Sequence, residues 1–235
     1  DRRYDCGELR PSAVLEVVQD AIAMLLDAVP LVGRDAQGGS PLHAYQRITW
    51  DTRDRLRPPR AGETVLVVDA KGFPPEGLDC DSRLEVRAWQ SGWRRFIVYG
   101  LTGQRFTGCG FGPRTAGGRM DIYGSSGDYL GSGIDGMEIR VHGSGQDQIA
   151  QIMKSGRLVV YGDVGQAFMY GAKGGEVYVM GNAAGRPLIN AVGGPRVVIN
   201  GVCLDFLAES FMAGEPHTGG GFVILNGIKF DDRGA

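Results

Sequence analysis

Reactive and metal-binding residue types are scarce in this sequence. Its 235 residues include four cysteines and three histidines, and no two cysteines have the CxxC spacing that holds zinc or an iron–sulfur cluster. The GxxxxGK[ST] phosphate loop and the GxSxG nucleophile elbow are also missing. These absences exclude the common metal, nucleotide and hydrolase designs. Four scattered thiols are typical of a reducing cytoplasm.

Long apolar runs and an excess of one charge are missing too. No apolar stretch approaches the ~20 residues that span a bilayer, and no signal peptide is visible. The net charge of −2 and the pI of about 6.0 do not favour nucleic acid or an anionic membrane as a partner. We therefore expect a cytoplasmic protein that binds neither nucleic acid nor membrane.

Glycine is abundant, and its distribution divides the chain. Only seven of the 39 glycines precede residue 90. After that, one glycine recurs with steps of 24, 19, 19, 19, 20 and 26 residues, at Gly100, Gly124, Gly143, Gly162, Gly181, Gly201 and Gly227. This period indicates ordered repetition rather than a flexible segment. We expect each glycine to supply a backbone bend, so Gly143→Val or Gly162→Val should destabilise the fold.

Apolar residues occupy fixed positions around these glycines. Two places before them stand Val98, Ile122, Val141, Val160, Val179, Ile199 and Leu225, and four places before them stand Phe96, Met120, Ile139, Leu158, Val177, Val197 and Val223. The residues between vary, which is the period-2 pattern of a strand with one buried face. A second apolar position follows six places after the glycine, at Phe106, Leu130, Ile149, Phe168 and Leu207, with Pro187 and Leu188 in the fifth repeat.

One repeat is too small to bury its own apolar face, but stacked repeats can. Strands that pair with their copies ~4.8 Å away predict a mainly β fold, a right-handed parallel β-helix of about seven turns over residues 95–230. The period is too short for propeller blades, and the sequence lacks the ladder of a leucine-rich repeat.

The first 94 residues lack the repeat and predict a small α/β capping segment. Residues 1–62 form a helix-and-loop segment, because residues 11–28 are typical of an amphipathic helix and residues 31–62 are rich in helix and strand breakers. Residues 63–94 form an α/β entry, with a strand at 63–68.

A short helix at residues 81–90 completes this entry, with Asp79 or Asp81 as its N-cap. At the other end of the chain, residues 203–212 are interpreted as a helix that caps the last turns. A cap is needed because an open end presents unpaired backbone groups.

Several residues invite a chemical interpretation, but each has a simpler one. Residues 131–136 match GxGxxG, yet the next repeat strand follows instead of the helix that a dinucleotide site needs. His142 stands in the outward slot before its glycine and is interpreted as one of a row of stacked side chains. Cys109, between two glycines, is interpreted as a small residue in a tight turn. His217 lies in a Pro- and Gly-rich loop that could touch a partner, and His43 has no obvious partner.

Recurrent aspartates and asparagines are interpreted as hydrogen-bonding residues of the turns. The aspartates are Asp121, Asp128, Asp135 and Asp147, and the asparagines are Asn182, Asn190, Asn200 and Asn226. The GGxGxDxUx repeat of a calcium β-roll is missing. We therefore predict no catalytic, cofactor-binding or metal-binding residue in this chain.

The glycine runs in GCGFG, YGSSGDYLGSG, VYGDVGQAFMYGAKGGEVYVMGNAAGRP and VVINGVCLDFLAESF resemble the GXGXG domain. That domain is the C-terminal β-helix of the glutamate synthase large subunit, and it also occurs in one of the subunits of formylmethanofuran dehydrogenase. The resemblance covers roughly residues 63–225. It is strongest to glutamate-synthase-like proteins in which the domain is a separate chain, on the evidence of VDAKGFPPEG followed by RRFIVYG.

The resemblance implies a structural or assembly subunit of a glutamate-synthase-type oxidoreductase complex that makes glutamate. Its expected partners are a glutamine amidotransferase-type subunit and an FMN/iron–sulfur subunit, which carry the cofactors that this chain does not bind. Two alternatives stay open: a scaffold subunit of another redox complex, such as a formylmethanofuran dehydrogenase type, and an independent hydrolase.

Assembly requires a surface for the partner. The candidate is a mixed face with Tyr99, Tyr123, Tyr161, Tyr178 and Met180.

Overall fold

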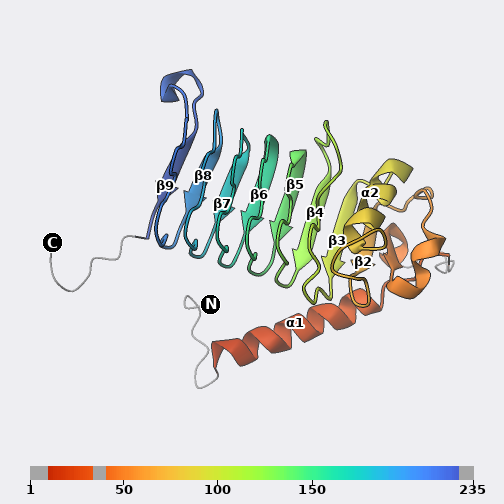
Figure 1. Ribbon diagram of the computed structural model, residues 1–235. Coiled ribbons are helices and arrows are strands. Elements are labelled where there is room, and N and C mark those ends of the chain that lie inside the picture. The colour runs from red at the N-terminus through yellow and green to blue at the C-terminus, as the bar shows by residue number, and fades with distance from the viewer. Residues whose placement is uncertain (1–9, 34–40, 228–235) are drawn as a thin grey trace.

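The computed structural model describes residues 10–33 and 41–227, and in this part the protein is mainly β. Nine strands form one all-parallel sheet in sequence order (Figure 1). They are β1 (Tyr45–Ile48), β2 (Val65–Asp69), β3 (Arg95–Tyr99), β4 (Arg119–Tyr123), β5 (Asp135–Val141), β6 (Ser155–Val160), β7 (Glu176–Val179), β8 (Arg196–Ile199) and β9 (Phe222–Leu225). From β3 onward we use the word coil for one repeat, that is, the segment that runs from one strand to the next together with the strand that it leads into.

The strand register confirms the predicted alignment of the repeats. Phe96 pairs with Met120, and the pairing continues through Ile139, Leu158, Val177 and Val197 to Val223. The row two places further on pairs in the same way from Val98 to Leu225. Both rows point inward and are buried from β3 to β8, so the period-2 pattern does set which sheet face forms the core.

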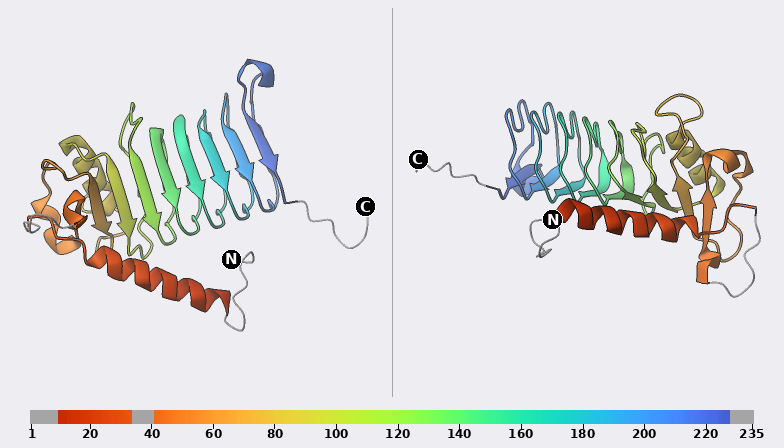
Figure 2. Two further views of the ribbon diagram at one scale, coloured as in Figure 1. Left: turned by 180° about the vertical axis from the view of Figure 1, so that it is seen from behind. Right: turned by 90° about the horizontal axis from the view of Figure 1, so that it is seen from below.

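A second line of parallel pairings lies within the coils. Isolated bridges join Ser126 to Gly145, and then Val164, Ala183 and Cys203 in succession. Figure 2 shows these segments stacked against one side of the sheet. Leu130, Ile149 and Phe168 project from them into the core and are fully buried, as predicted.

The predicted inward position is wrong at the first and last coils. Phe106 is partly exposed and stacks on Tyr129 with ring centroids 5.0 Å apart. Thr107 takes the inward position instead, since its carbonyl accepts a hydrogen bond from the N–H that follows Leu130. Leu207 is in register, but its side chain is 37% exposed because no further coil of the described chain covers it.

The segment before β3 contains the predicted helices and one strand that the sequence did not indicate. α1 (Pro11–Asp27) and α2 (Asp81–Ser91) agree with the prediction, and β2 lies one to two residues later than predicted. The region 31–62, interpreted as loop, contains β1 and the short 3-10 helices η1 (Pro41–Ala44) and η2 (Trp50–Arg55). The N-cap of α2 is Cys80, with no side-chain cap, rather than either aspartate.

The two ends of the stack are treated differently. At the first end, the free edge of β1 is covered by the segment before it, because Leu31 bridges Arg47 and the N–H of Val32 donates to the Arg47 carbonyl. At the last end, residues 203–212 are not the predicted helix. They form the outer wall of another coil, with Phe206, Ala208 and Ser210 at positive φ, a conformation that a right-handed helix excludes.

The period glycines have a different physical role from the one predicted. Only the first two, Gly100 and Gly124, have left-handed backbone angles, with φ of +70° and +118°. From Gly143 onward the reason for glycine is contact between coils. A Cβ on Gly143 would lie 2.5 Å from the Gly124 carbonyl carbon, and one on Gly162 would lie 2.8 Å from the Gly143 oxygen. The glycines therefore form a column where backbones touch.

Helix α1 runs alongside the sheet, beside the C-terminal ends of the early strands (Figures 1 and 2). Its last turns carry Ala23 and Leu26, which pack on a small outer cluster of Val29, Val65, Val67 and Tyr99. Arg47 joins this contact, since it hydrogen-bonds Asp27 at 2.5 Å. Other side chains of the helix, including Val17, Met24 and Leu25, are exposed.

Candidate docking surface on the outer face of the sheet

Three rows of side chains cover the outer face of the sheet. The charged row is Arg95, Arg119, Glu138, Arg157, Glu176 and Arg196. The middle row is Ile97, Asp121, Arg140, Val159, Tyr178, Val198 and Ile224. The end row is Tyr99, Tyr123, His142, Tyr161, Met180, Asn200 and Asn226. Parallel pairing places equivalent residues side by side, so these rows run along the stack rather than along any strand.

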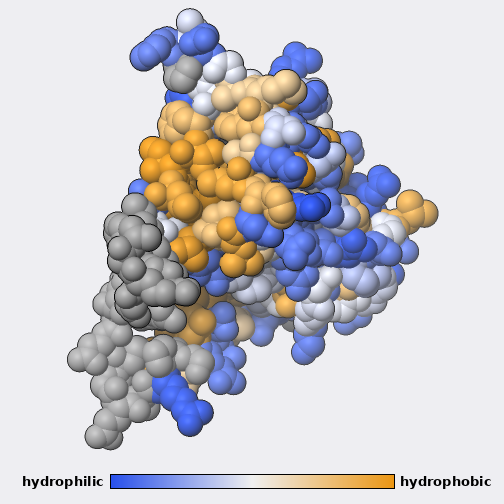
Figure 3. Space-filling view, turned by 60° about the vertical axis from the view of Figure 1, so that its left-hand side comes forward, coloured by the Kyte–Doolittle hydropathy of each residue, from blue (hydrophilic) through white to orange (hydrophobic). Residues whose placement is uncertain are grey.

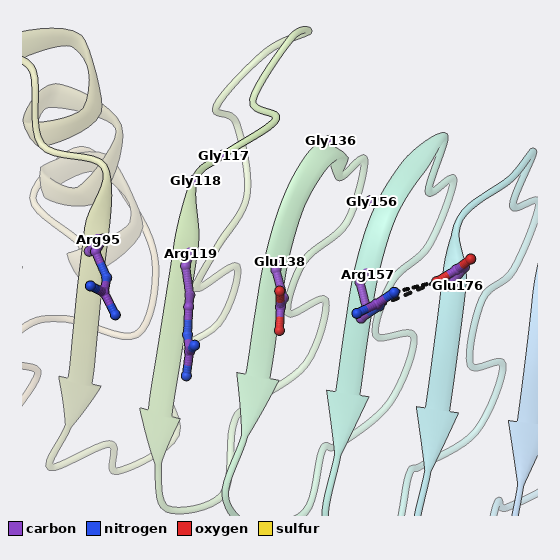
Figure 4. Close-up of a pocket in the computed structure, with 9 residues that line it drawn as sticks. All are labelled: Arg95, Gly117, Gly118, Arg119, Gly136, Glu138, Gly156, Arg157 and Glu176. Carbon is purple, nitrogen blue, oxygen red and sulfur yellow. Dashed lines mark hydrogen bonds and ion pairs between the residues drawn. The ribbon is translucent and has the colours of Figure 1, made fainter.

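The charged row borders a shallow cavity of about 460 Å³, which Gly117, Gly118, Gly136 and Gly156 also line, near the starts of their strands (Figure 4). Four of the row's six charges form ion pairs, with one another or with the middle row. Arg157 binds Glu176 at 2.8 Å, Arg140 binds Glu138 at 2.6 Å and Arg119 binds Asp121 at 2.7 Å. The row has four arginines and two glutamates, so it forms a solvated strip with a net positive charge, and its exposed ion pairs are weak.

The end row contains a stack of aromatic rings with His142 at its centre. The imidazole lies 4.4 Å from the Tyr123 ring and 5.0 Å from the Tyr161 ring, nearly parallel to both. The interpretation of His142 as one of a row of stacked side chains is confirmed. Its Nε2 also lies 3.2 Å from Asp121 Oδ1.

Asp121 is an electrostatic anchor on this face. Burial would raise its pKa, but the hydrogen bonds from His142 and Arg119 outweigh burial and lower the pKa to about 2. Ser125 lines the same side of the molecule, yet its Oγ accepts a hydrogen bond from the Ser144 N–H. The side chains that contact the His142 ring in the described chain are Asp121, Tyr123 and Tyr161. These contacts can hold the surface rigid, but they do not activate a nucleophile.

A groove separates α1 from the sheet. It encloses about 660 Å³, with Leu15, Val18 and Ile22 on the helix side and Tyr99, Tyr123 and His142 on the sheet side. Burial and the Asp27 carboxylate both raise the pKa of the Tyr99 hydroxyl, although a hydrogen bond from Arg47 opposes them. The hydroxyl itself donates to Asp27 at 2.6 Å.

The predicted partner face is only partly correct. Tyr99 is buried under α1 and is not available to a partner. Tyr161 and Tyr178 are exposed on neighbouring rows, and Tyr123 and Met180 are half-buried beside them. Val159, Val198 and Ile224 continue the middle row on either side of Tyr178, and sequence analysis missed them. Their sequence signal is their position, because each lies between the two inward-facing residues of its strand and therefore points outward.

A pair of buried acids on α2 was not predicted. Asp81 and Glu85 are one turn apart and fully buried. Thr107 Oγ1 donates to Asp81 at 2.8 Å, and the Gly108 N–H donates to Glu85 at 2.9 Å. Burial raises the pKa of Asp81 to about 6. Burial, and then repulsion from Asp81, raise the pKa of Glu85 well above its usual range.

This pair ties α2 to the first coil and is not open to a ligand. Its sequence signal is the spacing 81, 84, 85 and 88, which is one face of a helix. Leu84 and Ala88 complete that face and are fully buried.

The remaining candidate residues lie apart from one another. The Cys109 thiol donates to the Tyr129 carbonyl at 2.9 Å, and burial raises its pKa to about 12, which supports the structural interpretation. His217 is exposed in the 3-10 helix η3 (Pro216–Thr218). The GxGxxG match at 131–136 leads into β5 and not into a helix, as predicted.

The turn aspartates and asparagines largely behave as predicted. Asp128 and Asp147 accept hydrogen bonds from backbone N–H groups one coil later, and Asn182 and Asn226 bond the coil before them. Asp121 and Asp135 differ, because they lie on β4 and β5. Across residues 10–33 and 41–227, no group of three or more His, Cys, Asp or Glu residues could hold a metal ion. In the same ranges no helix is long and apolar enough to cross a membrane.

The stacked glycine column and the repeated strand register define a repeat protein with an extended outer face. The chain belongs to the GXGXG motif family, whose model matches residues 96–231. Comparison with curated proteins and with solved structures found no significant match.

Proposed function

We propose that this chain is a structural and assembly subunit of a glutamate-synthase-type oxidoreductase complex. Membership of the GXGXG motif family over most of the repeat is the observation that carries the proposal. The family resemblance stated above links that motif to domains that hold catalytic units in register. The coils are then the turns of a right-handed parallel β-helix of about seven turns, in agreement with the strong preference of parallel connections for that hand.

The outer face supports a docking role on physical grounds. Stacked coils pair along their whole length, so the face cannot bend at one coil without breaking its ladder to the next. Ion pairs in the charged row and ring stacking in the end row hold the side chains in place before a partner arrives. A preorganised surface loses less side-chain entropy on binding than a mobile one.

The middle row supplies apolar contact within this face. Val159, Tyr178 and Val198 lie next to one another across three strands, and Tyr161 and Met180 flank them. An apolar centre with a charged strip on one side is the usual anatomy of a protein interface. The proposed partners are a glutamine amidotransferase-type chain and a chain that carries FMN and iron–sulfur clusters. The reaction and its cofactors belong to those chains.

The proposal is tested by affinity purification of this chain from its native cell extract, with mass spectrometry and an absorption spectrum of the eluate. A yellow-brown eluate that contains both partner types is the expected result. A formylmethanofuran dehydrogenase-type set of partners would replace the proposal with its main alternative. A colourless, solitary chain would refute both.

Two variants locate the surface in the same experiment. Tyr178→Asp places a charge in the middle row and should strip the partners from the chain. Ile152→Asn is the matched control, because Ile152 is similarly exposed but lies on the wall opposite the sheet, with φ of +51°, a conformation that asparagine adopts readily. Equal partner recovery from both variants would show that the outer face is not the docking surface.

A further inference from the structure

The last end of the stack exposes an unusually apolar surface. Figure 3 shows a continuous hydrophobic area on the side where β9 ends the sheet. Its members are 37–72% exposed: Leu204, Phe206, Leu207, Met212, Phe222 and Ile224. Taking about 200 Å² for a fully exposed side chain of this size, they present roughly 600 Å² of apolar surface to solvent, the upper end for a typical monomer.

The last described coil carries apolar residues at positions that hold polar ones in several earlier coils. The charged row has Arg or Glu on every strand from β3 to β8, but Phe222 takes that position on β9. Met212 stands where earlier coils carry Lys154, Lys173 and then Val192. Phe206 shares its left-handed backbone position with Gln148 and Arg186, and also with Phe106, Tyr129 and Ala167. The clearest change is in the charged row, where Phe222 replaces an Arg or Glu at the last described coil.

The backbone at this end is equally unprotected. β9 pairs only with β8 in the described chain, and its residues Phe222–Leu225 include neither a charge nor a proline. Solvent-exposed edge strands normally carry such residues, because an unprotected edge pairs with another strand. The outer wall of the same coil bonds only backward, as when the Leu204 N–H donates to the Ala183 carbonyl.

We propose that this end binds the same end of a second copy of the chain. A two-fold axis normal to the sheet would pair β9 antiparallel with its copy, with Phe222 opposite Ile224 and Val223 on the axis. That register keeps outward side chains on the outer face, because directly opposed residues point to the same side. The axis also brings the wall at Leu204 and Phe206 onto its own copy, so both halves of the apolar surface are covered at once.

The area and the opposite end of the stack both fit this assignment. Standard interfaces bury about 800 Å² on each partner, which the six side chains nearly supply before any backbone or rim is counted. The first end cannot repeat the contact, since Pro30–Val32 cover the edge of β1 and Arg47 holds an ion pair with Asp27. An isologous contact at one end closes as a dimer and does not propagate into fibres.

The dimer contact does not depend on which enzyme the chain serves, and it is tested on the isolated full-length protein. Sedimentation equilibrium across a range of concentrations should give twice the 25.2 kDa chain mass. Ile224→Lys on β9 and Leu204→Lys on the wall should each weaken association at least tenfold. Leu25→Lys is the matched control, because Leu25 is as exposed as Leu204 but lies on α1. It should leave the dimer unchanged.

Circular dichroism spectra and melting temperatures check that the variants fold, and Met212→Lys replaces any that does not. A monomeric wild-type protein would overturn the inference. So would a dimer that Ile224→Lys and Leu204→Lys leave intact. A monomer that dimerises only after removal of residues 228–235 would show that the chain's own tail is the occupant. Tyr178 is not one of the six residues of this apolar surface, and the dimer is measured without the proposed partners, so failure here is distinguishable from failure of the proposed function.

Discussion

Replacement of Gly143 by alanine tests the contact between coils most directly. The added Cβ would lie 2.5 Å from the Gly124 carbonyl carbon and 3.0 Å from the Ser125 nitrogen. Carbon atoms in ordinary contact are at least about 3.5 Å apart, so the two coils must separate locally by roughly 1 Å. The neighbour is backbone and cannot rotate out of the way.

That separation acts on two hydrogen bonds that flank the site. The His142 N–H donates to the Ile122 carbonyl at 2.7 Å, and the Ser126 N–H donates to the Ser144 carbonyl at 2.9 Å. Weakening both, together with strain in the adjoining coil, should cost about 4 kcal/mol of unfolding free energy. In a chain of this size each kcal/mol lowers the melting temperature by about 2–4 °C, so a fall of roughly 8–16 °C is expected.

Gly133→Ala is the matched control. Gly133 has φ of +74°, and its added Cβ would meet nothing within 4 Å. Alanine there costs only the left-handed backbone strain of about 1–2 kcal/mol. Thermal melts followed by circular dichroism, with urea titrations, compare the two variants. If Gly143→Ala melts no lower than Gly133→Ala, the column of glycines does not exist to let backbones touch, and the reasoning fails.

Three further predictions concern the ionisable groups. Glu85→Gln should raise the free energy of unfolding at neutral pH and leave it unchanged near pH 4. The reason is that the pKa values of Asp81 and Glu85 are raised in the folded protein, so the two acids stabilise the fold fully below their unfolded pKa values and lose this effect as pH rises through about 6 and above. Equal shifts in urea titrations at pH 4 and pH 7 would contradict this. Asp121→Asn should cost about 1–2 kcal/mol above pH 4, discounted for solvent screening at the surface, and this cost should disappear as pH falls through about 2; an unchanged acid titration would argue against the anchor. Native Cys109 should react with a thiol reagent far more slowly than in the urea-unfolded chain, because burial raises its pKa to about 12; equal rates, read by mass spectrometry of the labelled peptide, would refute its structural role.

The repeat was predictable because every coil has to bury the same two rows of apolar side chains. Val141 and Val160 recur at a fixed distance from a glycine, and that pattern specifies strand, buried face and register together. The role of Gly143 was not predictable in detail. A backbone bend and a close backbone approach both require glycine, and only the position of the neighbouring coil separates them.

The remaining misses follow from context outside the local pattern. β1 is four residues long, and its Gln46 and Arg47 are polar, so nothing in the segment distinguishes it from loop until it pairs with β2. Residues 203–212 have helical spacing of apolar residues, but their backbone pairs with the preceding coil instead of forming a helix. The outer face was partly predictable from the free positions of the strands. That Tyr99 would be covered depended on where α1 packs.

The uniform register of the strands makes the length of this protein adjustable in fixed steps. Between Val160 and Val179 lies one 19-residue unit whose two boundaries occupy equivalent positions in the strand register and face inward in the same way. Deleting or duplicating such a unit would rejoin matching surfaces, and it would change the separation of the two ends by one strand spacing, about 4.8 Å. The number of coils therefore sets the distance between the two ends of the stack.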